Sequence, residues 1–253
     1  MRHFGLIGKS LGHSFSAKFF NGKFKAEQID ADYQLLEIED VADIDRLIKE
    51  HNLEGFNVTI PYKEAIIPHL DGLTKEAHDI GAVNCVVIKN GQKIGHNTDL
   101  TGIEASLHWL DIDSMPKALI LGTGGASKAV QYALKRRGIE FMVVSRTEGR
   151  GDITYNNLTP EIIAEHKLII NTTPVGMFPD VENAPTIDYS AISAEHRLFD
   201  LVYNPAKTQF LTRGKERGAK TMGGMLMLQT QAIASWHLWN ERVTDEGCEG
   251  PVA

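Results

Sequence analysis

The chain has 253 residues, a mass of 28.0 kDa and a formal net charge of −7, and 42% of its residues are hydrophobic. An acidic chain of this ordinary globular composition is not expected to bind nucleic acid or an anionic membrane surface as its main partner. At roughly 150 residues per domain, the length corresponds to one or two domains.

The two cysteines, Cys85 and Cys248, lie far apart, and neither belongs to a CxxC motif or a His-Cys cluster. We therefore expect no disulfide framework and no metal site, and a cytoplasmic location. Lys9 interrupts the apolar stretch at the N-terminus, and no apolar run reaches ~18 residues. Neither a signal peptide nor a membrane span is expected.

The first hundred residues alternate between short apolar runs and helical patterns, which is typical of an α/β layer. Strands are predicted at residues 4–8, 33–38, 56–60 and 83–88, and helices at 17–28 and 44–51. A helix over 100–110 follows, and the polar stretch 111–116 then ends in a proline and suits a connection between two units.

A second alternating series begins after this connection. It predicts strands at 118–121, 141–145, 168–171 and 198–202, with helices at 126–137 and 160–166. The few residues between Arg146 and Ile153 cannot form a parallel crossover, so 153–156 is expected to be a loop or an edge piece. A long apolar helix over 225–241 is expected to pack against the first domain, and the tail 244–253 to fray.

A glycine-rich loop, Gly122-Thr123-Gly124-Gly125-Ala126-Ser127, lies between the strand at 118–121 and the following helix. In this context the first glycine permits a tight turn, the second admits a pyrophosphate, and the N–H groups of the helix receive the anion. Ser127 replaces the third glycine of the fingerprint. The alternative is a tight turn without a ligand.

The strand at 141–145 ends in Ser145-Arg146-Thr147, with Arg150 close behind, where NAD enzymes carry an acidic residue for the ribose 2′-hydroxyl. A guanidinium offers donors to a 2′-phosphate but no acceptor to a hydroxyl, so the sequence favours NADP over NAD. The alternative is that both arginines are solvated loop cations.

Polar clusters occur at the ends of the predicted strands in the first half, where functional groups are commonly displayed. Lys63, steered by the carboxylate of Asp99, can act as the general acid in carbonyl reduction and as the base in reverse. Each candidate also has a structural alternative. In that alternative, Lys63 is a surface lysine at a helix start. Asp99 is the N-cap of 100–110, and Ser16 is the N-cap of 17–28. Asn84 is a satisfied strand-end amide, and His13 and His96 are ordinary polar residues.

The order of these motifs resembles the shikimate dehydrogenase family along nearly the whole chain. The matching segments are 13–16, 57–63, 81–84, 97–99, 122–127, 145–147, 171–177, 200–205 and 224–226, together with Gly8 and Gln229. The chain departs from the family's pattern at 147–152, which is too short for the usual helix, and at 221–224.

The resemblance implies NADPH-dependent, reversible reduction of 3-dehydroshikimate to shikimate, on the route to chorismate and the aromatic amino acids. Lys63 and Asp99 look like the catalytic pair. Substrate ligands are implied at Ser14, Ser16, Thr59, Asn84, Asp99, Tyr203 and Gln229, and cofactor contacts at Gly122, Gly124, Gly125, Ala126, Ser145, Arg146, Thr147, Arg150, Met177, Val202 and Gly224.

The expected fold is α/β. An N-terminal α/β substrate domain would comprise residues 1–99 and 221–253, a Rossmann-type NADP-binding domain residues 100–220, and the C-terminal helix would return to the first domain. The expected partners are a small-molecule substrate and NADP, with no nucleic acid or membrane, in a monomer or homodimer. Two alternatives remain: a quinate/shikimate dehydrogenase with broader substrate and cofactor use, and a catalytically silent nicotinamide-binding regulator.

Overall fold

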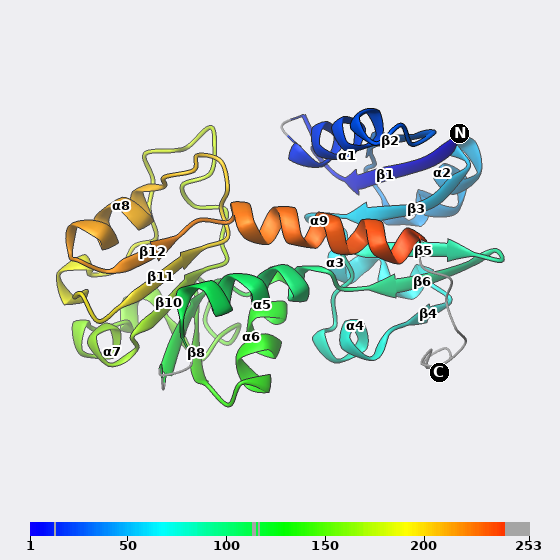
Figure 1. Cartoon of the computed structure of the whole chain (residues 1–253). Helices are drawn as coiled ribbons and strands as arrows, with labels where there is room; N and C mark the ends of the chain where they lie inside the picture. Colours follow the sequence, from blue (N-terminus) through cyan, green and yellow to red (C-terminus); the bar gives the residue numbers. More distant parts are fainter. Residues whose placement is uncertain (13, 113–114, 116, 241–253) are drawn as a thin grey trace. The chain divides into compact units, whose positions relative to one another are not determined.

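The computed structural model of the chain describes residues 1–12, 14–112, 115 and 117–240 (Figure 1). The chain divides into two compact units. Unit 1 comprises Met1–Thr98 and the chain from Ala232 onward, and unit 2 comprises Asp99–Gln231. His13, Cys248 and the tail 244–253 lie outside the described residues. Among the described residues, no helix combines the length and the apolar character needed to cross a membrane.

Unit 1 is built on a mixed six-stranded sheet with the order β2-β1-β3-β5-β6-β4 (Figure 1). Strand β1, the second strand in this order, pairs in parallel with β2 and β3, whereas β5 is antiparallel to both of its neighbours. Its strands are β1 (Arg2–Gly8), β2 (Ala31–Glu37), β3 (Leu53–Val58), β4 (Gly72–Leu73), β5 (Cys85–Lys89) and β6 (Gln92–His96), and its helices are α1 (Phe15–Ala26), α2 (Ile44–His51), α3 (Tyr62–Ala65) and α4 (Lys75–Ile80).

An aromatic cluster forms one core of unit 1 and includes the end of the chain's last helix, α9 (Met225–Asn240). The ring of Trp239 stacks on Phe4 with the centroids 4.7 Å apart, and its indole N–H donates to the carbonyl oxygen of Val86 at 3.1 Å. A Cβ on Gly55 would lie 2.4 Å from the Trp239 ring nitrogen, so only glycine leaves room for the indole. The expected return of the C-terminal helix to the first domain is thus confirmed.

Unit 2 has a six-stranded sheet in the order β12-β11-β10-β7-β8-β9, with every neighbouring pair parallel. Counted from the first strand of the unit, this is the 3-2-1-4-5-6 order of a Rossmann-type fold. The strands are β7 (Lys117–Leu121), β8 (Glu140–Ser145), β9 (Ile153–Thr154), β10 (Leu168–Asn171), β11 (Arg197–Asp200) and β12 (Lys220–Met222), and the helices are α5 (Asp99–Leu110), α6 (Gly125–Arg136), α7 (Pro160–Glu165), α8 (Gln209–Glu216) and the start of α9.

Close packing joins α5 to the start of α9 within unit 2. A Cβ on Gly102 would lie 2.4 Å from the carbonyl oxygen of Met227, so the glycine lets the two backbones approach. Both predicted layers are confirmed as α/β. The prediction of an edge piece after Arg146 is also confirmed, because β9 is the outer strand of this sheet.

Several element boundaries differ from the sequence-based predictions. The strand predicted at 56–60 ends at Val58, so Ile60 lies outside it, and the strand predicted to begin at Val83 begins at Cys85. The last predicted strand, 198–202, ends at Asp200, which leaves Val202 in the following loop. The elements that the predictions lacked are β4, β6, β12, α3, α4 and α8.

Candidate active site

The first polar cluster of unit 1 lies at the start of α1. The helix begins at Phe15, and the side chain of Ser14 is its N-cap, accepting a hydrogen bond from the backbone N–H of Ser16 at 3.2 Å. The alternative interpretation of Ser16 as the N-cap is therefore wrong. Ser16 is buried and Ser14 is half-buried. Because α1 begins at Phe15, both serines lie within its first turn.

The second cluster follows the carboxyl end of β3. The backbone N–H of Thr59 donates to the carbonyl oxygen of Ile7 at 2.9 Å, which continues the pairing of the two parallel strands. Lys63 lies in the short helix α3, and its carbonyl oxygen accepts the N–H of Val83 at 2.7 Å. The side chain of Lys63 is half-buried, which differs from a solvated surface lysine.

The third cluster surrounds Asn84, which is buried just before β5. Its side-chain oxygen accepts the backbone N–H of Thr98 at 2.6 Å, and its amide nitrogen donates to the Thr98 hydroxyl at 2.9 Å. Asp99 follows directly, is buried, and is the first residue of α5 rather than the residue before the helix. The N-cap interpretation of Asp99 is therefore wrong. Nearby, His96 is neutral, because burial lowers its pKa to about 4.

The predicted substrate ligands are divided between the two units. Ser14, Ser16, Thr59, Lys63 and Asn84 belong to unit 1, whereas unit 2 contains Asp99, Tyr203 and Gln229. Tyr203 is half-buried after β11, and Gln229 is exposed on the second turn of α9.

The glycine loop of unit 2 leaves open space at the start of α6. Gly122 has φ +113°, and a Cβ there would lie 2.7 Å from the Thr172 hydroxyl oxygen. A Cβ on Gly124 would meet no atom within 4 Å, so open space lies over the loop. Gly124 is also the N-cap of α6 and has no side chain to cap the helix, which leaves first-turn N–H groups to an anion. The half-buried Ala126 follows in that turn.

The predicted 2′-phosphate residues lie in the loop between β8 and β9. Ser145 is buried, and its hydroxyl accepts the backbone N–H of Thr147 at 3.0 Å. Arg146, Thr147 and Arg150 are exposed. Arg146 lies near enough to Tyr155 to lower the phenol's pKa, although burial, the larger influence, raises that pKa to about 12.

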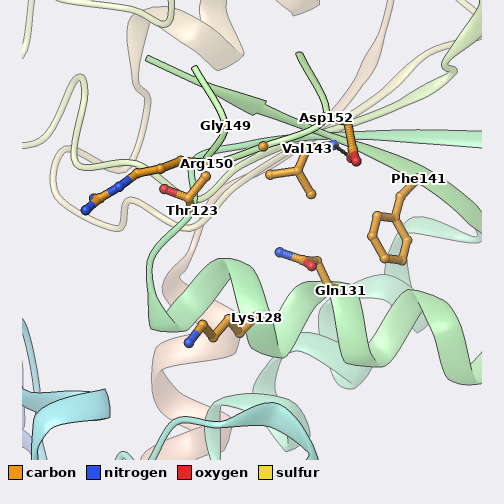
Figure 2. A pocket seen from close by; sticks show the side chains of 9 residues that line it. Thr123, Lys128, Gln131, Phe141, Val143, Gly149, Arg150 and Asp152 are labelled. Carbon is orange, nitrogen blue, oxygen red and sulfur yellow. Dashed lines mark hydrogen bonds between the residues drawn. The ribbon is translucent and has the colours of Figure 1, made fainter. Parts of the chain in front are cut away.

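A pocket of about 440 Å³ opens between this loop and α6 (Figure 2). Arg150 and Thr123 lie on one side of it, and Lys128 and Gln131 rise from α6 on the other (Figure 2). Lys128 was not among the residues predicted from the sequence to bind the cofactor, although a cation in the second turn after a glycine loop is a recognisable signal of an anion site. The remaining lining residues are Phe141, Val143, Gly149, Gly151 and Asp152.

The carboxylate of Asp152 is bound to the backbone of unit 2. Its Oδ2 atom accepts the N–H of Val143 at 2.7 Å, and its own N–H donates to the Val143 carbonyl oxygen at 2.9 Å. A Cβ on Gly151 would lie 2.7 Å from the same carbonyl oxygen. These contacts hold the short loop against β8 and engage the Asp152 carboxylate with the backbone of that strand.

The residues predicted to approach the nicotinamide lie near the ends of β10 and β11. The N–H of Gly224 donates to the carbonyl oxygen of Val202 at 3.0 Å, and a Cβ on Gly224 would lie 2.2 Å from the carbonyl oxygen of Leu201. Val202 is buried, whereas Met177 is 40% exposed. The structure therefore brings Val202 and Gly224 together within unit 2.

Asp200 fixes the loop that contains Val202. Its carboxylate accepts the N–H of Val202 at 3.0 Å, an amide N–H of Asn171 at 2.9 Å and the Thr208 hydroxyl at 2.6 Å. Burial raises the pKa of Asp200 to about 6, against the lowering effect of these donors. In the described part of the chain, no group of three or more His, Cys, Asp or Glu side chains is arranged to hold a metal ion.

Known proteins are similar to this chain along most of its length. Residues 6–86 match the family model of the shikimate dehydrogenase substrate binding domain. A relative named shikimate dehydrogenase (NADP(+)), from Carboxydothermus hydrogenoformans, is 37% identical over 252 residues, which cover 93% of this chain and 90% of the relative.

Solved structures match both units. Shikimate dehydrogenase 1 from Peptoclostridium difficile is 37% identical with a TM-score of 0.84, and the match covers 97% of this chain and 94% of that one. Shikimate 5-dehydrogenase from Thermus thermophilus, solved in complex with NADP(H) and shikimate, is 32% identical with a TM-score of 0.83, covering 97% and 95%. The resemblance predicted from the motifs is confirmed, and the chain belongs to the shikimate dehydrogenase family.

Proposed function

We propose that this chain catalyses the reversible, NADPH-dependent reduction of 3-dehydroshikimate to shikimate, a step towards chorismate and the aromatic amino acids. The observation that carries the proposal is the match, over 93% of the chain, to a relative named shikimate dehydrogenase (NADP(+)). The presence of both Lys63 and Asp99 favours an enzyme over a nicotinamide-binding regulator, which needs no proton donor.

Unit 1 is proposed as the substrate domain. The match of residues 6–86 to a substrate-binding domain supports this assignment. Ser14 and Ser16 bind the carboxylate of the substrate through their hydroxyls. Thr59, Asn84, Gln229 and Tyr203 are proposed as ligands of the ring hydroxyls, since neutral hydroxyls and amides suit a polyhydroxylated ligand, and Asp99 is proposed as a further ligand through its carboxylate.

Unit 2 is proposed as the NADP domain. The open space over Gly124 and the uncapped start of α6 fit the pyrophosphate, with Gly122, Gly125 and Ala126 completing the loop. When bound, NADPH supplies the hydride for the carbonyl carbon. Met177, Val202 and Gly224 line its nicotinamide end, and Ser145, Arg146, Thr147 and Arg150 bind the 2′-phosphate.

Lys63 is the proposed general acid. During reduction the carbonyl oxygen gains negative charge, and the Lys63 ammonium group donates a proton to it, which yields the hydroxyl of shikimate. In the reverse direction the neutral amine accepts that proton. Asp99 acts as the carboxylate that steers the lysine and also contacts a ring hydroxyl. The half-buried position of Lys63 on α3 supports a role at a site rather than on the open surface.

We place this reaction in the cytoplasm, because two widely separated cysteines are not the pattern of a disulfide-stabilised secreted protein. The oligomeric state is proposed as monomer or homodimer, and light scattering on the purified protein distinguishes the two.

The decisive assay supplies shikimate or quinate together with NADP or NAD and follows the absorbance of the reduced nicotinamide. Turnover of shikimate with NADP, and much weaker turnover with NAD, is the expected result. Comparable turnover of quinate favours the broader quinate/shikimate dehydrogenase. Absence of turnover with every combination, while NADP still binds, favours the silent regulator and rejects the proposal.

A further inference from the structure

Two completely buried polar residues, Asn171 and Asp200, join the carboxyl ends of strands β10 and β11 in unit 2. Each is the last residue of its strand, and the parallel register places them side by side. The Asn171 amide nitrogen donates to the Asp200 carboxylate at 2.9 Å. A buried carboxylate is costly unless donors surround it. Asp200 has two more donors, the N–H of Val202 at 3.0 Å and the Thr208 hydroxyl at 2.6 Å.

Asn171 also holds the loop that follows β10. Its side-chain oxygen accepts the backbone N–H of Thr173 at 3.0 Å and the Thr173 hydroxyl at 2.6 Å, and its amide nitrogen donates a longer bond to the carbonyl oxygen of Val175 at 3.4 Å. Because a backbone N–H only donates, the contact with Thr173 fixes which end of the amide is oxygen and directs the nitrogen to Asp200. Asn171 thus holds the loop after β10, Asp200 holds the loop after β11, and one hydrogen bond links the two.

The pair lies beside the place where a sheet of this order binds its ligand. In an open parallel sheet, ligands bind at the carboxyl ends of the strands where the strand order reverses, which is here between β7 and β10. Thr172 spans this point, since its backbone N–H and its hydroxyl both donate to the carbonyl oxygen of Leu121, at 2.9 and 2.7 Å. A Cβ on Gly122 would lie 2.7 Å from that hydroxyl oxygen. The glycine loop therefore rests against the residue that follows Asn171.

In the other direction, the pair leads to the residues proposed for the nicotinamide. Val202, whose N–H is bound by Asp200, accepts the N–H of Gly224 through its carbonyl oxygen at 3.0 Å. Met177 lies in the loop after β10 that Asn171 holds. A continuous set of contacts therefore connects the glycine loop with the two loops proposed to face the nicotinamide ring.

We propose that Asn171 and Asp200 are positioning residues that hold these two loops in register with the glycine loop, and so set the position from which the nicotinamide transfers its hydride. This inference rests on the proposed function, in which Met177, Val202 and Gly224 contact the nicotinamide. A displacement of the reacting groups by about 1 Å can slow a reaction on the order of 100-fold, so small shifts of these loops are expected to affect the rate. The loop after β8, proposed for the 2′-phosphate, is outside these contacts.

The test compares hydride transfer with cofactor binding in Asn171→Ala, Asp200→Ala and Asp200→Asn. Single-turnover oxidation of NADPH by 3-dehydroshikimate gives the rate of hydride transfer. Calorimetric titration gives the dissociation constant of 2′-phospho-ADP-ribose, which is NADP without the nicotinamide ring. Both alanine variants should slow hydride transfer roughly 10- to 100-fold and leave this dissociation constant within about twofold. Asp200→Asn should stay within about threefold of the wild type in both, because its oxygen still accepts from Val202 and Asn171.

His196→Ala is the matched control, at the opposite end of β11. His196 directly precedes this strand and is also completely buried. Its Nδ1 atom accepts the backbone N–H of Ser193 at 3.0 Å, so its Nε2–H donates to the carbonyl oxygen of Ile163 at 3.1 Å. Removing these buried hydrogen bonds should lower the melting temperature about as much as Asn171→Ala does, without slowing hydride transfer. The melting temperature of every variant is measured alongside the kinetics.

Three results would overturn the inference while leaving the proposed function intact. These are wild-type hydride transfer in both alanine variants, binding of 2′-phospho-ADP-ribose that weakens as much as hydride transfer slows, and a His196→Ala control or an Asp200→Asn variant as slow as Asn171→Ala. A wild-type protein that transfers no hydride to 3-dehydroshikimate would instead reject the proposed function, and this inference with it. Should Asp200→Ala fail to fold, Asn171→Ala and Asp200→Asn decide the question.

Discussion

The hydroxyl of Ser127 donates a hydrogen bond to the carbonyl oxygen of Gly122 at 2.7 Å and accepts one from the Gln131 amide at 3.1 Å. Ser127 thus closes the glycine loop at the position where the dinucleotide fingerprint has its third glycine. The serine that departs from the motif therefore forms a structural contact between the end of β7 and the first turn of α6.

We expect Ser127→Gly to destabilise the protein, although it restores the fingerprint. The change removes a buried hydrogen bond and places glycine in a helix, each worth about 1 kcal/mol, so the melting temperature should fall by roughly 4–8 °C. Ser127→Ala separates the two contributions, because alanine favours the helix but lacks the hydroxyl. An unchanged or higher melting temperature for Ser127→Gly would contradict this account of the loop.

Gly124→Ala should weaken NADP binding without affecting the fold. A Cβ at Gly124 meets no protein atom within 4 Å, so the melting temperature should stay within about 2 °C, while the methyl group occupies the space proposed for the pyrophosphate and raises the KM of NADP by about tenfold or more. Gly122→Ala is the contrasting variant, because its backbone has φ +113° and its Cβ would clash with Thr172. Normal NADP kinetics in Gly124→Ala would place the pyrophosphate elsewhere.

Arg146→Ala should change the preference between the two nicotinamide cofactors. Losing a charged donor to the 2′-phosphate is expected to raise the KM of NADP roughly 10- to 100-fold and to leave that of NAD nearly unchanged. Arg46→Ala, on an exposed arginine of α2 that pairs with Glu50, serves as the control. An unchanged ratio of the two cofactor KM values would remove Arg146 from the 2′-phosphate site.

Lys63→Ala should abolish most of the turnover. General acid catalysis contributes about 10²- to 10⁴-fold, so kcat should fall by that factor while the dissociation constant of NADP, measured by fluorescence titration, stays the same. Lys75→Ala, on an exposed lysine paired with Asp79, controls for the loss of a positive charge in unit 1. A near-normal kcat in Lys63→Ala would exclude it as the proton donor.

Asp200 should give unit 2 a stability that declines as the pH rises from about 4 to about 6. Burial raises its pKa to about 6, so the folded protein takes up this proton at a higher pH than the unfolded chain does. Its contribution to the free energy of unfolding is therefore lost as the pH rises through the folded pKa, by on the order of 3 kcal/mol in total.

Asp200→Asn should remove this dependence, because the amide does not titrate and its oxygen can still accept from Val202 and Asn171. Urea unfolding of both proteins between pH 4.5 and 7.5 provides the measurement. The stability difference between Asp200→Asn and the wild type should shift in favour of the variant as the pH rises. A difference that stays constant with pH would show that the carboxyl titrates normally.

Regular periodicity predicted the positions of most helices and strands, and two of them, α2 and β10, have the predicted bounds. Strand β6 was not predicted from the sequence, because the polar residues Gln92 and Lys93 interrupt its apolar pattern. Its signal was the Asn90-Gly91 pair, which has φ +51° and +78° and joins β5 to β6 in a tight hairpin. The turn residues were therefore more informative there than hydrophobicity.

The candidate site was predictable wherever one local segment contains the whole pattern, as in the glycine loop. The hydrogen bonds of Ser235 to Asn57 and Thr98 in unit 1 were not, because these residues lie far apart in the sequence and only the fold brings them together. The interpretation of Ser16 as the N-cap of α1 was wrong for a local reason. Both Ser14 and Ser16 suit an N-cap, and the sequence does not determine at which of them the helix begins.

The indole of Trp239 also affects the order in which the protein is completed during synthesis. Phe4, Phe20 and Tyr33 are translated about 200 residues or more before the Trp239 ring that covers them. Unit 2, whose residues end at Gln231, is available in full before unit 1 can close its core. The nascent sheet of unit 1 thus lacks the cover of this indole until all of unit 2 has been translated, and transiently exposed aromatic surface of this kind is prone to aggregate.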